Sequence, residues 1–284
     1  MPKVSSAHPS GRKPKLGQHF LTDPTAPGRI ADALGDISRS TVFEIGPGRG
    51  ALTSLLAKRA RRLIAIETDR VLAAQLRMKF SLYPNVEIIE GDILAVDFDT
   101  IFGPKPGSTR PGISQKPEQV RVVGNLPYFI TSDILLRLFA HRRYFETIVL
   151  MVQREVADRL AAAPGNSEYG LLSATTQLYA TVEKLFTLPP AAFTPPPKVH
   201  STVVRLTVTP RLEGLHVPET AFIDFLKLSF GQKRKTLWNN LKTQYDGKAL
   251  RAAMEESGVK SDARSEALSL EKTAALFRAL SNGN

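Results

Sequence analysis

The stretch of sequence that decides the fold is TVFEIGPGRG, residues 41–50. It begins with a short apolar run at 41–45, which has the length and composition of a buried strand. Glycines follow at positions 46, 48 and 50, and residues 51–58 then have the spacing of a helix. Glycines let such a turn be tight and let a ligand approach the backbone closely. This order predicts the opening unit of a ligand-binding α/β sheet.

Further apolar runs along the chain complete the predicted sheet. They are rich in Val, Ile and Leu, and a helical pattern at 71–80 separates the first two of them. Continuous runs of this kind indicate parallel strands that are covered on both faces. The runs lie at 62–66, 86–89, 120–123 and 147–152, and a β-branched run at 201–208 suits a last strand.

The character of the sequence changes at about Pro210. Residues 222–241 and 248–280 have helical spacing and no strand-like alternation. We therefore predict an α/β fold with a Rossmann-like sheet domain at 16–209 and a small all-helical domain at 210–284. Residues 1–15 are basic and rich in Ser, Pro and Gly, which predicts a flexible arm. Residues 103–118 have a similar composition and predict an inserted surface loop.

Polar residues stand at the ends of the predicted strands, where ligands of open α/β sheets bind. Glu44 precedes the glycine turn, where an anion disfavours a pyrophosphate but suits the ammonium group of S-adenosylmethionine. Glu67 ends the second strand and is placed to accept hydrogen bonds from both ribose hydroxyls. Asp92 follows the third strand, where it can accept from the adenine amino group. With the backbone of Gly46 and Gly48, this set favours S-adenosylmethionine over a nicotinamide cofactor, so an NAD-dependent oxidoreductase is disfavoured.

The tetrapeptide Asn125-Leu126-Pro127-Tyr128 follows the fourth strand. The N6 amine of adenine is a poor nucleophile, because its lone pair is delocalised into the ring, so an enzyme must orient it. The Asn125 side-chain carbonyl and the Leu126 main-chain carbonyl can accept its two N–H bonds. Pro127 stiffens the turn, and Tyr128 can stack on an extruded base. The tetrapeptide therefore predicts methyl transfer to an exocyclic amine through positioning and electrostatics.

Composition limits the partners. Lys and Arg number 38 against 27 Asp and Glu, a surplus of +11, which fits either a nucleic-acid partner or a basic soluble protein. The absence of cysteine excludes disulfides and thiolate metal sites, and we expect no metal. No apolar run approaches the roughly 20 residues that span a bilayer, and the N-terminus has no secretory signal. We expect a cytoplasmic monomer with no membrane partner.

Four segments together resemble the KsgA-type ribosomal RNA adenine dimethyltransferases, over nearly the whole chain. They are LGQHFL at 16–21, the turn at 44–50, the tetrapeptide at 125–128 and FTPPPKVHS at 193–201. The resemblance implies S-adenosylmethionine as cofactor. It also implies dimethylation of two adjacent adenosines in a hairpin loop near the 3′ end of small-subunit ribosomal RNA, during ribosome biogenesis, with the RNA or a pre-assembled small subunit as partner.

The resemblance also assigns individual residues. His19 and Leu21 would line the cofactor site with Gly46, Glu67, Asp92 and Asn125. The Phe193 ring would stack on the target base, on the opposite side from Tyr128. Many members have Asn where this chain has His19, and the insertion at 103–118 is longer than is usual in the family.

Basic residues suggest where RNA binds. We expect Lys198 to contact RNA, and a helix across 222–241 to present Lys233, Arg234 and Lys235 to the phosphate backbone, with Trp238 in the core. Three other functions remain open: a large-subunit RNA methyltransferase of the antibiotic-resistance type, a DNA adenine methyltransferase, and a non-catalytic ribosome-assembly factor of the same fold. The RNA-type motifs disfavour DNA as substrate, and the intact Asn125 to Tyr128 segment argues against lost catalysis.

Overall fold

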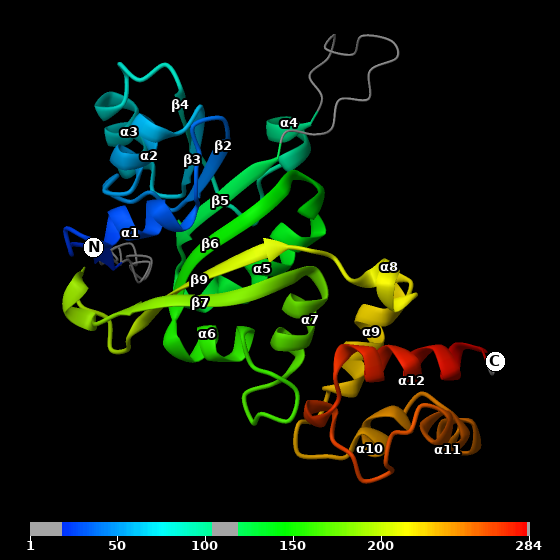
Figure 1. The fold of residues 1–284 in the computed structure, drawn as a ribbon. Helices are drawn as coiled ribbons and strands as arrows, with labels where there is room; N and C mark the ends of the chain where they lie inside the picture. The colour runs from blue at the N-terminus through cyan, green and yellow to red at the C-terminus, as the bar shows by residue number, and fades with distance from the viewer. Residues whose placement is uncertain (1–18, 104–118, 283–284) are drawn as a thin grey trace, which may run out of the picture.

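The computed structural model describes residues 19–103 and 119–282 (Figure 1). The predicted basic arm at 1–15 and nearly all of the insertion, residues 104–118, lie outside the described residues. No helix within the described ranges is long and apolar enough to cross a membrane.

A seven-stranded sheet forms the centre of the molecule, in the order β4-β3-β2-β5-β6-β9-β7. The first five strands of that order run parallel, whereas β9 is antiparallel to both of its neighbours. All six predicted strands are present, and the fold class is confirmed. Only β7 has no counterpart among them. The strands are β2 (Thr41–Ile45), β3 (Arg62–Glu67), β4 (Val86–Glu90), β5 (Val120–Asn125), β6 (Phe145–Gln153), β7 (Ala180–Leu188) and β9 (Ser201–Val208).

Helices cover both faces of this sheet, which is why strand β2 is buried at every position. On one face Val42 packs with the helices α1 (Ala26–Ala33), α2 (Thr53–Arg59) and the last turn of α3 (Arg70–Lys79). On the other face Phe43 packs in a larger cluster. The helices that contribute to that cluster are α4 (Phe98–Phe102), α5 (Thr131–Ala140), α6 (Arg154–Leu160) and α7 (Leu171–Tyr179).

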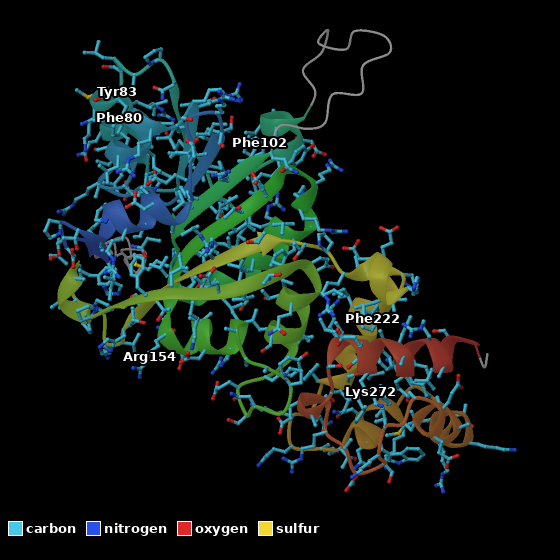
Figure 2. All side chains as sticks on the ribbon, viewed as in Figure 1. Phe80, Tyr83, Phe102, Arg154, Phe222 and Lys272 are labelled. Carbon is cyan, nitrogen blue, oxygen red and sulfur yellow. The ribbon has the colours of Figure 1, made fainter. Side chains whose placement is uncertain are left out.

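The chain after β9 is helical, and its core is continuous with the larger cluster. Phe222 and Phe225 place their rings 5.5 and 5.4 Å from that of Phe277. Phe222 is labelled in Figure 2, among the C-terminal helices. Trp238 packs against the same core at partial exposure, as predicted. The helices are α8 (Leu212–Leu215), α9 (Glu219–Ser229), α10 (Leu237–Leu241), α11 (Gly247–Glu256) and α12 (Leu270–Asn282).

The predicted helix across 222–241 is wrong in its middle. Helix α9 ends at Ser229, and α10 begins only at Leu237, where the Thr236 hydroxyl caps it by accepting from the Asn239 amide. The intervening segment contains Gly231 and is a loop. The predicted span 248–280 is likewise interrupted, at 257–269, where Gly258 has a φ of 61°.

A second, two-stranded sheet joins two distant parts of the chain. Strand β1 (Phe20–Leu21) pairs antiparallel with β8 (Phe193–Thr194), and the Thr22 amide donates to the Ala192 carbonyl at 2.8 Å. The N-terminal segment is thereby tied to the proline-rich segment that precedes β9. Short 3-10 helices complete the fold, at Tyr128–Ile130, Arg142–Tyr144, Pro190–Ala192 and Ser265–Ala267.

Candidate active site

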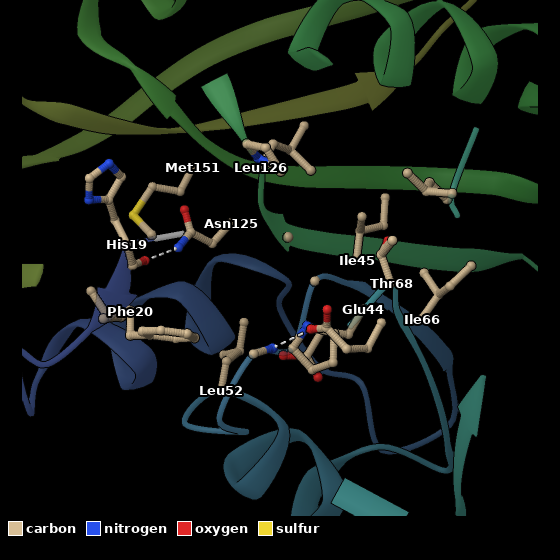
Figure 3. A pocket seen from close by; sticks show the side chains of 18 of the residues that line it. His19, Phe20, Glu44, Ile45, Leu52, Ile66, Thr68, Asn125, Leu126 and Met151 are labelled. Carbon is tan, nitrogen blue, oxygen red and sulfur yellow. Dashed lines mark hydrogen bonds between the residues drawn. The ribbon is translucent and has the colours of Figure 1, made fainter. Parts of the chain in front are cut away.

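A cavity of about 330 Å³ lies at the carboxyl ends of the parallel strands (Figure 3). It is lined by residues from the ends of β2, β3 and β5, from the glycine turn and from β1. All eight residues predicted to bind a cofactor are among those lining it, namely His19, Leu21, Glu44, Gly46, Gly48, Glu67, Asp92 and Asn125. Leu126 and Pro127 of the tetrapeptide line it as well.

The glycine turn needs its glycines for two reasons. Gly46 and Gly48 have φ values of 67° and 56°, which L side chains rarely adopt. A Cβ on Gly48 would also lie 3.2 Å from the Phe20 ring. The turn therefore packs closely against β1, and a side chain at Gly48 would require the Phe20 ring to shift.

Glu44 is an unusual group, because it is a carboxyl that is only 2% exposed and still lines the cavity. Its Oε2 has no hydrogen-bond partner among the described residues. Burial raises the pKa of Glu44 to about 8, and the negative charge of Glu67 adds to the increase. A buried carboxyl with an unsatisfied oxygen is costly on its own, so this site fits a ligand that brings a cationic donor.

Glu67 is buried at the end of β3 and holds the turn in place. Its Oε2 accepts from the Gly48 amide at 3.0 Å, and its Oε1 accepts from the Asp69 amide at 2.9 Å. Each carboxylate oxygen has a second lone pair, so both remain able to accept from ribose hydroxyls. Asp92 is exposed at the cavity, and its Oδ1 accepts from the Leu94 amide at 2.9 Å.

Asn125 ends β5 beside the cavity, and its side-chain Nδ2 donates to the His19 main-chain carbonyl at 3.0 Å. Since that carbonyl can only accept, the nitrogen of the amide must face it. The amide oxygen of Asn125 then faces the other way and is available as an acceptor. His19 is held in turn, because its Nδ1 lies 2.7 Å from the Pro195 carbonyl oxygen.

The rest of the tetrapeptide forms a tight turn. Leu126 is buried, and its amide donates to the Met151 carbonyl at 3.3 Å. Pro127 has a φ of −59°, and its carbonyl accepts from the Ile130 amide. Tyr128 begins a 3-10 helix, and the predicted role of its side chain lies outside what the structure describes.

Other predicted residues lie away from the cavity. Phe193 is 3% exposed in the hydrophobic cluster beside β1 and does not line the cavity. Lys198 is exposed in the loop before β9. Lys233, Arg234 and Lys235 are exposed in the loop between α9 and α10, so the expectation that a helix presents them is wrong. The Lys233 ammonium donates to the Ser167 carbonyl at 2.6 Å.

Several side chains that line the cavity were not predicted, among them Phe20, Arg49 and Phe129. Phe20 supports the glycine turn, Arg49 lies over the Phe20 ring, and Phe129 is 67% exposed. The signal for Phe20 was its place between His19 and Leu21. Arg49 lies within the glycine turn, and Phe129 directly follows the tetrapeptide.

Comparisons with known proteins identify the family of the chain. The model of the family described as ribosomal RNA adenine dimethylase matches residues 10–282. A protein of Koribacter versatilis named ribosomal RNA small subunit methyltransferase A is 58% identical, over 100% of both chains. A protein of Acidobacterium capsulatum with the same name is 53% identical, over 94% of this chain and 91% of the relative.

Two solved structures share the fold over most of the chain. A dimethyladenosine transferase from Plasmodium falciparum matches with a TM-score of 0.74 and 27% identity, covering 91% of this chain and 96% of that one. The 23S rRNA methyltransferase ErmE matches with a TM-score of 0.67 and 27% identity, covering 92% and 99%. The sequence matches extend across the strand ends, the tetrapeptide and the C-terminal helices alike. The chain belongs to the ribosomal RNA adenine dimethylase family, a family of rRNA adenine methyltransferases.

Proposed function

We propose that this protein dimethylates the N6 amines of two adjacent adenosines in a hairpin loop near the 3′ end of 16S ribosomal RNA, with S-adenosylmethionine as donor. The observation that carries the proposal is the orientation of Asn125, whose amide oxygen is left free beside a cavity with an acidic end. The relatives named small subunit methyltransferase A, at 58% and 53% identity, favour this substrate over 23S rRNA, the substrate of the more distant ErmE.

The residues around the cavity fit S-adenosylmethionine. The unsatisfied Glu44 carboxyl suits the ammonium group, Glu67 suits the ribose hydroxyls, and Asp92 suits the adenine amino group. Gly46 and Gly48 bring the backbone to the ligand, and His19 and Leu21 close the other side. When bound, the cofactor supplies an electrophilic methyl group.

The tetrapeptide then orients the acceptor. In this proposal Asn125 Oδ1 and the Leu126 carbonyl accept the two N–H bonds of the target amine, so that its lone pair points at the methyl group. The nitrogen is cationic after it gains the methyl group, and it loses its proton to water without a general base. A second transfer repeats the step. Tyr128 stacks on the extruded base, and Phe193 would have to leave its buried position to stack as well.

RNA binding is assigned to exposed cations. Lys198 and the loop with Lys233, Arg234 and Lys235 would contact phosphates, in a monomer that acts in the cytoplasm during assembly of the small subunit. The C-terminal helices at 210–284 would form the RNA-binding part of the chain.

The test is transfer of labelled methyl groups to isolated, undermodified small subunits and to assembly intermediates. We expect two dimethylated adenosines per RNA. Transfer only to large-subunit RNA would favour the resistance-type function, and tight RNA binding without transfer would favour an assembly factor.

A further inference from the structure

Arg49 lies inside the glycine turn, between Gly48 and Gly50, and lines the cavity. Its guanidinium carbon is 4.5 Å from the centre of the Phe20 ring, a distance typical of a cation–π contact. It forms no ion pair with the carboxylates of the described residues. The side chain is therefore held at the cavity by an aromatic ring, with its hydrogen-bond donors still available.

The charges around the cavity are uneven. Three carboxyl groups line it, those of Glu44, Glu67 and Asp92, and Arg49 is the sole Lys or Arg among the lining residues that the structure describes. His19 also lines the cavity, but its Nδ1 lies 2.7 Å from the Pro195 carbonyl oxygen. Among the described residues that line the cavity, the Arg49 guanidinium is thus the group that can form an ion pair with an anionic part of a ligand.

Backbone amides of glycine turns often bind anions, but here the amides of the three glycines already have partners. The Gly46 amide donates to the Ile66 carbonyl at 3.0 Å, and the Gly50 amide donates to the Pro47 carbonyl at 2.9 Å. The Gly48 amide donates to Glu67 Oε2 at 3.0 Å. These three glycine amides are therefore not open to an anion, whereas the Arg49 guanidinium lies at the same turn and lines the cavity.

We propose that Arg49 binds the α-carboxylate of the methyl donor. The inference rests on the proposed function and adds the group that recognises the amino-acid end of S-adenosylmethionine. That end is zwitterionic, with an ammonium and a carboxylate on one carbon. Glu44 precedes the turn and Arg49 follows Gly48, so a carboxyl for the ammonium group and a guanidinium for the carboxylate stand at the same turn.

The test compares two ligands and several variants by equilibrium binding in the absence of RNA. The ligands are S-adenosylmethionine and its decarboxylated form, which keeps the sulfonium, the adenosine and the amine. For Arg49→Met we expect about tenfold weaker binding of S-adenosylmethionine, the loss typical of a hydrogen bond between charged groups. Binding of the decarboxylated ligand should change less than about twofold, because the lost contact is absent from it.

Arg39→Met is the matched control. Arg39 is exposed just before β2, at the opposite end of that strand from the turn, and we expect it to leave both ligands unaffected. Arg49→Lys keeps the charge and should recover part of the affinity, and unfolding curves without ligand identify any variant that fails to fold.

Three outcomes would overturn the proposal. The first is an equal loss for both ligands, and the second is no loss for either. The third, from a separate RNA-binding titration of Arg49→Met, is weaker RNA binding with unchanged donor binding, which would make Arg49 a phosphate contact. If the wild-type protein bound neither ligand, the proposed function itself would fall as well.

Discussion

The side-chain amide of Asn125 donates to the main-chain carbonyl of His19 across 106 residues of sequence, at 3.0 Å. This bond ties the end of β5 to the N-terminal segment, and β1 in turn pairs with β8. The orientation of Asn125 thus depends on two segments that are distant from it in sequence.

Replacing Asn125 with Ala should remove most turnover, by about 10²–10³-fold, because one of the two acceptors for the target amine is lost. Binding of S-adenosylmethionine should change little. Initial rates on undermodified small subunits and equilibrium binding of the donor check the two parts separately. Unchanged turnover would remove Asn125 from its assigned role.

Replacing Glu67 with Ala should weaken donor binding and also destabilise the empty protein by about 1–3 kcal/mol, because the Gly48 and Asp69 amides lose their acceptor. Glu67→Gln retains one carbonyl oxygen, so its donor affinity and its stability should lie between those of the wild type and those of Glu67→Ala. Donor affinity and urea midpoints of the three proteins provide the measurement. An unaltered dissociation constant would place Glu67 outside the binding site.

The pKa of Glu44 gives a pH dependence with a definite sign. Its pKa is about 8 in the folded protein and 4.5 in an unfolded chain. The folded state therefore retains a proton that the unfolded state has lost, and the contribution to stability falls as the pH rises from about 4.5 to about 8. Glu44→Gln should remove this fall, so its stability relative to wild type should increase across that range. Denaturant unfolding at several pH values tests this. A stability difference between Glu44→Gln and wild type that stays constant from about pH 4.5 to about pH 8 would contradict it.

The same carboxyl should couple donor binding to proton release. An ammonium group next to Glu44 favours the charged carboxylate, so binding near pH 7 should displace its proton to the buffer. Calorimetry in buffers of different ionisation enthalpy measures that release. Glu44→Gln is the control and should release none from this group.

Much of the fold could be predicted because buried parallel strands are continuous apolar runs. Strands β2 and β9 have the predicted bounds. Strand β7 was missed because it lies at the edge of the sheet and is largely exposed, with Glu183 and Lys184 in its middle. The loop after Ser229 was missed because helical spacing continues across it, while Gly231 and the Thr236 cap end one helix and start another.

The site was predictable in part for a similar reason. The carboxyl ends of neighbouring parallel strands meet, so Glu67 and Asn125 were expected near one cavity, where they lie. The burial of Phe193 was not predictable, because it depends on the pairing of Leu21 with Phe193 between two very short strands. Local sequence contains no signal for a contact of that range.

Gly124→Ala should disturb the site from inside the sheet. A Cβ there would lie 2.8 Å from the Ile45 carbonyl oxygen, in the backbone of the neighbouring strand β2. We expect a loss of about 1–3 kcal/mol in stability and reduced turnover, because Asn125 is the next residue. Gly28→Ala is the control, since nothing lies within 4 Å of its added Cβ and alanine favours helix α1. Equal unfolding midpoints for the two variants would refute the steric argument.

The cations of the loop between α9 and α10 should determine the salt dependence of RNA binding. Arg234 and Lys235 are exposed there and form no ion pair with the described residues. Replacing both with Gln should reduce the slope of log affinity against log salt by about 0.7–0.9 per lost phosphate contact. The control is the pair Arg59→Gln and Arg62→Gln, whose guanidinium groups already bind Asp32 at 2.7 Å and Glu87 at 2.8 Å. RNA-binding titrations at several salt concentrations should show a reduced slope for the loop variant and an unchanged slope for the control variant. Donor affinity should stay constant in both. An equal change of slope in the two variants would mean that the loop has no special role in RNA binding.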